Sequence, residues 1–264
     1  MSINKVFEQL ATENKKAFIP YITAGDPNLE GTELFIKGLI KAGASIIELG
    51  VPFSDPIADG VTNQKAAERA LKNNISLNDI LDFIGNLREK NITIPFVVFT
   101  YYNPLLRMGL ENFAKKASEK GVNGVLVVDL PPESAEEYKS ILDKYNLETI
   151  FLASPTTAKE RLELIDKSSS GFVYYVSRTG VTGAQQNISS TLKDEIKEVK
   201  EIIKKPIAVG FGISTPEQAK EVSNYGEGVI VGSAIVKMIE VGTDINEIAN
   251  NIYNFSKSIV DNIS

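Results

Sequence analysis

The sequence contains no cysteine, no histidine and no tryptophan. Without cysteine the chain has no disulfides, thiolate metal sites or cysteine nucleophiles, which is typical of a reducing compartment. Without histidine it can form neither a Ser-His-Asp triad nor a histidine-rich zinc site. An enzyme of this composition must therefore move protons with carboxylates, lysine, tyrosine or water, and no metal site is expected.

The chain also lacks a net positive charge and any long apolar run. The net charge of −6 argues against a nucleic-acid-binding protein, which usually presents a basic face. No apolar run approaches the roughly 18 residues of a membrane-spanning helix. The first residues soon reach Glu8 and Glu13 without a secretory apolar segment. We therefore expect a cytoplasmic protein that binds neither nucleic acid nor membrane.

The 264 residues show no linker or change of composition that would divide them, so one domain over 1–264 is expected. Eight short, apolar, β-prone runs recur along the chain. Near-continuous apolar runs of this length are typical of parallel strands that are covered on both faces. The runs are Phe18–Tyr21, Ile46–Leu49, Phe96–Phe99, Val125–Val128, Thr149–Leu152, Phe172–Val176, Ile207–Val209 and Val229–Val231.

Amphipathic segments separate these runs, with apolar residues at helical spacing. One begins at Leu77, another at Leu192, and the C-terminal one runs from Ile245 to Ile259. Eight strands alternating with helices in about 250 residues favour a single (β/α)₈ TIM barrel over a doubly wound sheet. No strand is followed by the Gly-x-Gly-x-x-Gly of a dinucleotide fold. Ile3 and Phe7 predict an extra N-terminal helix.

Glu48 interrupts the second apolar run near its end. Period-two alternation puts it on the same face as Ile46 and opposite Ile47 and Leu49. If that face is the barrel interior, burial favours the neutral carboxyl, which could then both give and take a proton near neutral pH. A structural ion pair with an interior Lys or Arg is the alternative.

The segment after this run, Val51–Gly60, contains two prolines and two aspartates. Asp55 precedes a proline and Asp59 precedes Gly60, so turn formation alone can explain either. The functional alternative is a second carboxylate on a loop that closes over a substrate.

Glycine-rich segments follow the last two runs. Val209-Gly-Phe-Gly-Ile-Ser leads to Pro216, with Thr215 as the expected helix cap, and Val231-Gly-Ser leads to another helix. Loops after the seventh and eighth strands commonly bind phosphate in such barrels, through backbone N–H groups at a helix N-terminus. We therefore expect a phosphate site here.

Four segments together resemble the tryptophan synthase alpha subunit family. They are Pro20–Pro27, Glu48–Gly60, Ser177–Gly183 and Val209–Ser214, and the resemblance runs over essentially the whole chain.

The resemblance implies a retro-aldol lyase that splits indole-3-glycerol phosphate into indole and glyceraldehyde 3-phosphate. The family's catalytic glutamate falls on Glu48, expected to protonate indole C3 and to take the hydroxyl proton. Its aspartate falls on Asp59, expected to hold the indole N–H. The implied substrate-binding residues are Tyr21, Phe99, Tyr101, Tyr174, Thr182, Gly183, Phe211, Gly212, Gly232 and Ser233.

The same resemblance implies a partner. Family members join a pyridoxal-phosphate beta subunit in an α2β2 heterotetramer and pass indole to it, so the cofactor is expected in the beta chain and none in this one. The residues that fall on the partner-facing positions are Pro52, Phe53, Asp55, Asn103 and Pro131.

Three alternatives remain at this stage. A stand-alone indole-3-glycerol phosphate lyase would release free indole without a beta subunit. A non-catalytic binding module would need neither Glu48 nor Asp59. Another phosphate-binding barrel, such as an isomerase, would explain the glycine-rich loops but not the segment Glu48–Gly60.

Overall fold

The computed structural model describes residues 1–177, 192–210 and 212–263. Its eight parallel strands pair in chain order, and β8 pairs with β1 to close a barrel. All eight predicted strands are confirmed, with ends that differ by at most two residues. The strands are β1 Ala17–Thr23, β2 Ile47–Gly50, β3 Phe96–Thr100, β4 Gly124–Val127, β5 Glu148–Ala153, β6 Val173–Val176, β7 Ile207–Gly210 and β8 Gly228–Val231.

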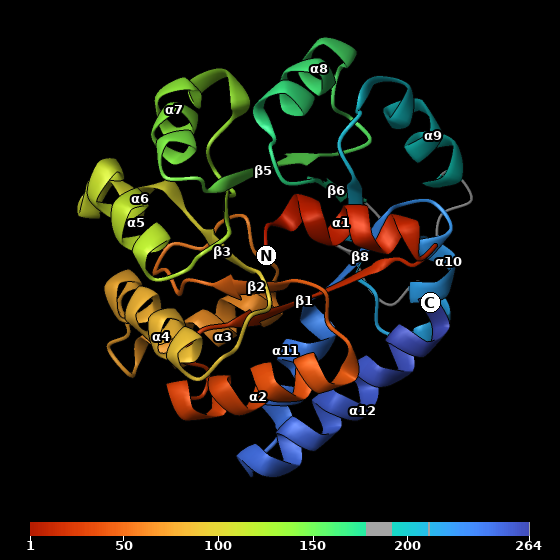
Figure 1. Ribbon diagram of the computed structural model, residues 1–264. Coiled ribbons are helices and arrows are strands. Elements are labelled where there is room, and N and C mark those ends of the chain that lie inside the picture. Colours follow the sequence, from red (N-terminus) through yellow and green to blue (C-terminus); the bar gives the residue numbers. More distant parts are fainter. Residues whose placement is uncertain (178–191, 211, 264) are drawn as a thin grey trace.

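Helices surround the strands as an outer layer (Figure 1), so the expected TIM barrel is confirmed. Helix α1, Ile3–Thr12, is the predicted extra helix. The other helices are α2 Leu29–Ala42, α3 Val61–Leu71, α4 Leu77–Glu89, α5 Tyr102–Met108, α6 Leu110–Glu119, η1 Pro132–Ser134, α7 Glu136–Lys144, α8 Lys159–Ser168, α9 Leu192–Ile202, α10 Pro216–Ser223, α11 Ser233–Val241 and α12 Ile245–Ile263.

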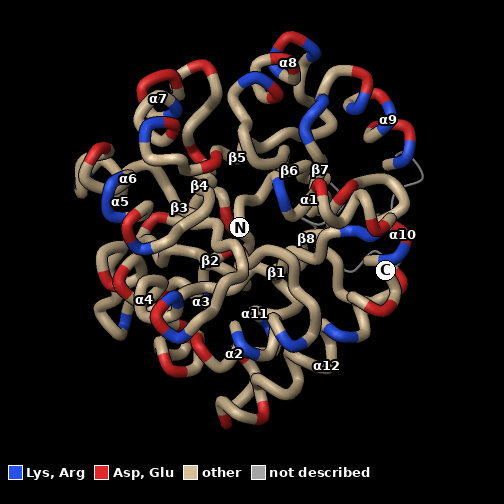
Figure 2. Tube along the Cα trace, viewed as in Figure 1, with Lys and Arg blue, Asp and Glu red and all other residues tan. Residues whose placement is uncertain are grey.

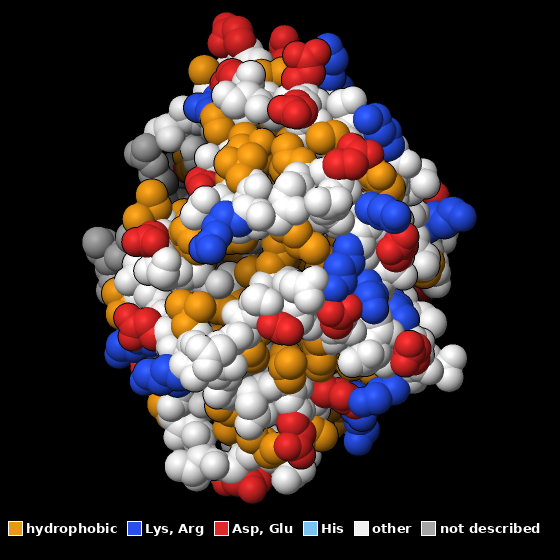
Figure 3. All heavy atoms as spheres, turned by 90° about the vertical axis from the view of Figure 1, so that its left-hand side faces the viewer, with side chains coloured by type: hydrophobic (Ala, Val, Ile, Leu, Met, Phe, Trp, Pro, Cys, Tyr) orange, Lys and Arg blue, Asp and Glu red, His pale blue; other side chains and the backbone are white. Residues whose placement is uncertain are grey.

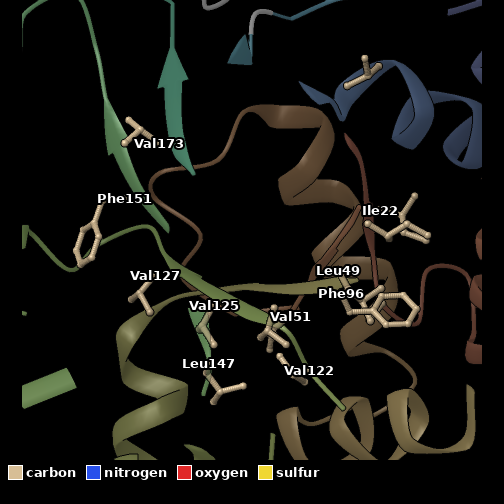
Figure 4. Packing of buried hydrophobic residues seen from close by; sticks show 14 of the residues in the cluster. Ile22, Leu49, Val51, Phe96, Val122, Val125, Val127, Leu147, Phe151 and Val173 are labelled. Atoms are coloured by element: carbon tan, nitrogen blue, oxygen red, sulfur yellow. The ribbon is translucent and has the colours of Figure 1, made fainter. Parts of the chain in front are cut away.

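Alternation along the strands separates two apolar clusters. One fills the barrel interior and includes Ile19, Ile46 and Leu126. The other lies between the strands and the outer helices, and Figure 4 shows part of it, including Leu49 and Val125. Because Ile46 belongs to the inner cluster, Glu48, two residues later on β2, also points into the barrel.

Helix α1 lies across one end of the barrel (Figure 1) and buries Ile3, Val6 and Phe7 against the inner cluster. Glu148 at the start of β5 fixes this helix. Its carboxylate accepts hydrogen bonds from the backbone N–H of Ile3 at 2.6 Å and from both the backbone and side-chain N–H groups of Asn4. A carboxylate at a helix N-terminus is stabilised by the unpaired N–H groups there.

Charged residues gather on the helices and loops (Figure 2), and both signs are interspersed on the side of the molecule seen in Figure 3. Within the eight strands only Glu48 and Glu148 are charged. Glu148 serves α1 at one end of the barrel, which leaves Glu48 as the strand carboxylate without a structural partner. Among the described residues, no helix is long and apolar enough to cross a membrane.

Candidate active site

Glu48 is completely buried, and neither of its carboxyl oxygens has a hydrogen-bond partner in the protein. The interior Lys or Arg that a structural ion pair requires is therefore missing among the described residues. Burial raises the pKa of Glu48 to about 8. At neutral pH the group is mainly a neutral acid that can donate a proton, and little free energy separates its two protonation states.

Two tyrosines lie beside this carboxyl group. Tyr21 is the register partner of Glu48 across β1 and β2. Burial raises the pKa of both Tyr21 and Tyr174, and the charges of Glu48 and Asp59 raise them further. Both tyrosines therefore remain protonated phenols. The charges of Glu48 and Asp59 act on both of them, so these two acids and two tyrosines belong to one site.

Inward-facing glycines make room for these two rings. A Cβ atom at Gly50 would overlap the Tyr21 hydroxyl group, and one at Gly210 would lie 2.5 Å from the Tyr174 hydroxyl oxygen. Any side chain larger than hydrogen at either position would displace a ring. The two glycines therefore leave the space that the Tyr21 and Tyr174 rings occupy inside the barrel.

Asp59 lies on the loop after β2, and its carboxylate accepts a 2.7 Å hydrogen bond from the Tyr101 hydroxyl group. The backbone N–H of Ala58 donates to the same hydroxyl at 3.0 Å, and the Gln64 amide donates to the Asp59 carbonyl oxygen at 2.9 Å. Burial raises the pKa of Asp59, while hydrogen bonds from Tyr101 and Asn63 oppose the rise. The loop thus does more than turn the chain, because it fixes this carboxylate near Tyr21 and Tyr174.

Apolar side chains lie around Glu48 on the inner face of the strands. Tyr21 and Phe99 form an edge-to-face pair with ring centroids 5.1 Å apart. Val128 and Leu152 also face the interior as partly exposed side chains above the inner cluster. Sequence reasoning missed these two, although alternation from Leu126 and Ile150 would have placed them on the inner face.

The sequence predicts a phosphate site at the N-termini of α10 and α11, and these two helices differ in how their N-termini are capped. At α10 the predicted cap is confirmed: Thr215 and Gln218 form a capping box, and the backbone N–H of Ser214 also donates to the Gln218 side chain. At α11 the cap residue Gly232 makes no side-chain hydrogen bond. The exposed Ser233 opens this helix, so the N–H groups of residues 233–235 can receive an anion.

Gly212 is exposed with φ +61°, a conformation that favours glycine, and so it can bring its backbone close to a ligand. Gly232 lies beside Tyr21, with 3.3 Å between its ideal Cβ position and the Tyr21 Cβ. The expected phosphate end and the aromatic wall are therefore neighbours. Three predicted residues, Thr182, Gly183 and Phe211, lie outside the described residues.

The predicted partner-facing residues lie on the outer side of the same barrel end. Pro52, Phe53 and Asn103 line one surface hollow of about 450 Å³. The Phe53 ring packs against Tyr101 at 5.0 Å between centroids. Asp55 and Pro131 are exposed, and Pro131 lines a separate hollow of about 440 Å³ at the ends of β4 and β5.

The closed barrel and the buried, unpartnered acid define a class of protein: a TIM-barrel enzyme suited to proton transfer. Comparison with known proteins identifies the family. The family model for the tryptophan synthase alpha chain matches residues 7–262. The chain belongs to the tryptophan synthase alpha chain family, and it is accordingly a lyase of the type that cleaves indole-3-glycerol phosphate.

Individual relatives agree with this assignment. The chain is 49% identical over 234 residues to the tryptophan synthase alpha chain of Geobacter sulfurreducens, covering 89% of this chain and 88% of the relative. The relative from Solibacter usitatus is 42% identical, with 97% and 96% covered. The crystal structure of the Legionella pneumophila strain Paris alpha subunit is 38% identical, with a TM-score of 0.91 and 100% of both chains covered.

Proposed function

We propose that Glu48 and Asp59 carry out the retro-aldol cleavage of indole-3-glycerol phosphate to indole and glyceraldehyde 3-phosphate. The observation that carries this proposal is the complete burial of Glu48 without a protein partner, which keeps its carboxyl group protonated near neutral pH. A protonated acid inside an apolar barrel suits the first step, proton donation to indole C3.

Proton transfer to C3 removes the aromaticity of the five-membered ring and leaves positive charge on the ring nitrogen. Asp59, held by Tyr101, stabilises that charge through the indole N–H. The Glu48 carboxylate then takes the proton of the adjacent side-chain hydroxyl group. The oxygen forms the aldehyde C=O, the C–C bond breaks, and its electrons restore the indole ring. Glu48 ends protonated, as it began.

The two ends of the substrate bind at opposite ends of the site. The phosphate group binds at the N-terminus of α11, with Gly212, Gly232 and Ser233 as donors. Tyr21, Phe99 and Tyr174 enclose the indole ring. Thr182, Gly183 and Phe211 belong to the same proposal through the family resemblance. The reaction needs no cofactor in this chain, because carboxyl groups carry every proton.

We further propose that the chain joins a beta subunit in an α2β2 complex. The family works with such a subunit, and the hollow lined by Pro52, Phe53 and Asn103 offers it an apolar recess. Phe53 contacts Tyr101, and Tyr101 donates a hydrogen bond to Asp59. A beta subunit that binds at this surface can therefore change the position of Asp59 through these two contacts. Pyridoxal phosphate would be a cofactor of the partner.

Indole release from indole-3-glycerol phosphate, measured with and without a beta subunit, tests both proposals. Slow release that rises steeply when the beta subunit is added is the expected result. Fast release that ignores the beta subunit would instead identify a stand-alone lyase. No release under either condition would contradict the proposed chemistry.

A further inference from the structure

Asn63 belongs to the buried face of α3. Its helical spacing to Ala66, Ala67 and Ala70 is three, four and seven residues, and these three alanines are buried. Ala66 packs in one cluster with Tyr21 and Phe99. Asn63 lies one turn closer to the start of the helix, which follows Asp59 by two residues. Its side chain is therefore directed to the wall between Asp59 and the aromatic residues.

The two ends of the Asn63 side chain differ in their surroundings. The side chain opposes the rise in the pKa of Asp59, as an N–H donor near a carboxylate does, so its amide nitrogen is the end that faces Asp59. The carbonyl oxygen Oδ1 is buried and has no partner. Among the described residues, five buried side-chain polar atoms lack a partner: this oxygen, both oxygens of Glu48, and the hydroxyls of Ser169 and Ser256.

Neighbouring donors are already engaged. The Tyr101 hydroxyl donates to Asp59, and the Gln64 amide donates to the backbone of Asp59 and Pro56. A buried amide oxygen without a donor is costly, and such groups often point to a ligand or to water. Unlike a serine hydroxyl, which can also donate, this amide oxygen can only accept and therefore needs a donor.

We propose that Asn63 is a further substrate-binding residue, whose buried carbonyl oxygen accepts a hydrogen bond from a donor of the bound substrate. The donor is a hydroxyl group of the glycerol chain, since the proposed function assigns the indole N–H to Asp59. This inference rests on the proposed function, because it takes the ligand of the Glu48 and Asp59 site as given. Asn63 would then bind the substrate through a hydrogen bond and not only through packing.

The test replaces Asn63 by leucine, which has nearly the same shape but neither accepts nor donates. Titration calorimetry would measure the Kd of indole-3-glycerol phosphate in a Glu48→Gln background, where the ligand is expected to persist. A second ligand, indole-3-propanol phosphate, keeps the N–H and the phosphate but lacks the hydroxyl groups. Asn86→Leu, at an exposed position of α4, is the matched control.

We expect Asn63→Leu to weaken substrate binding by about tenfold, because a lost partner leaves a buried donor unpaired. Weaker binding of the substrate with unchanged binding of the analogue is the expected result, because only the substrate has hydroxyl groups to donate. Equal weakening of both ligands would show that the substitution acts through the indole end of the site and would overturn the assignment. The Kd of inorganic phosphate should not change. Asn63→Ala serves as a second variant should the leucine protein fail to fold, as judged by circular dichroism.

Unchanged Kd values for both ligands in a folded Asn63 variant would overturn the inference and leave the proposed function intact. In that case Oδ1 would be satisfied by water alone. If the unsubstituted protein neither cleaved the substrate nor bound the analogue, the proposed function itself would fail, and this inference with it. The two failures are therefore distinguishable.

Discussion

The Tyr101 hydroxyl group donates a 2.7 Å hydrogen bond to the Asp59 carboxylate, joining the end of β3 to the loop that follows β2. The same hydroxyl accepts a bond from the Ala58 backbone, so one phenol fixes both the side chain and the main chain of this loop. Sequence reasoning expected Tyr101 as part of the indole wall. Its contacts add a role in positioning Asp59.

Replacing Tyr101 by phenylalanine should lower kcat by about 5- to 30-fold with little change in KM. The variant loses one hydrogen bond to a charged group, a contribution of about 1–2 kcal/mol to the orientation of Asp59. Steady-state kinetics would measure it. Tyr145→Phe, which removes an exposed hydroxyl group that donates to Glu111, is the matched control. An unchanged kcat would show that Asp59 keeps its orientation without Tyr101.

Asp59→Asn should reduce kcat by more than tenfold and change ligand affinity only modestly, because the neutral amide cannot stabilise charge that develops during the reaction. Measuring kcat beside the Kd of a non-reacting analogue separates the two effects. A change in affinity alone would make Asp59 a binding residue.

Glu48→Gln should keep the fold and phosphate binding while lowering kcat by at least about 100-fold, because only the proton-transferring group changes. Indole release and inorganic phosphate binding would be measured on the same sample. Glu148→Gln makes the same substitution at the other strand carboxylate and should leave kcat unchanged. Near-normal turnover of Glu48→Gln would refute the assigned mechanism.

Burial of Glu48 also predicts a dependence of stability on pH. Its folded pKa of about 8 lies above the unfolded value of 4.5, so the folded state binds the proton more tightly. Protonated Glu48 therefore contributes to the free energy of unfolding. This contribution is fully present below pH 4.5 and is lost as the pH rises through 8, by up to roughly 1.4 kcal/mol per pH unit.

Denaturant unfolding of the unsubstituted protein and of Glu48→Gln between pH 5 and pH 9 would isolate this contribution. As the pH rises, the unsubstituted protein should lose stability relative to the glutamine variant, because only the unsubstituted protein has the Glu48 proton to lose. A difference that stays flat across this range would show that Glu48 is charged in the folded protein at neutral pH.

Glu148→Gln should destabilise the fold by about 1–3 kcal/mol, since its carboxylate accepts three hydrogen bonds from Ile3 and Asn4 and the amide can replace only some of them. Thermal unfolding would measure the loss. Because Glu148 lies at the end of the barrel opposite the expected phosphate site, the activity of the folded variant should be retained. No change in unfolding temperature would mean that α1 is held by apolar contacts alone.

The sequence by itself determined the fold class. Runs such as Phe96–Phe99 are apolar without interruption, because parallel strands in a barrel are covered on both sides, and this pattern is local enough to read directly. The same period-two alternation placed Glu48 on one face with Ile46, and the structure shows that this face is the barrel interior. The expectations of one domain over 1–264 and of a cytoplasmic location remain predictions.

The tertiary structure decided what each polar group meets. No local pattern shows that Glu48 lacks a partner, that Tyr101 reaches Asp59 from another strand, or that Gly50 makes room for the Tyr21 ring. The α3 residue Asn63 likewise gave no signal in the sequence. Strand and helix propensities act between near neighbours, whereas desolvation and hydrogen-bond partners depend on residues that only the closure of the barrel brings together.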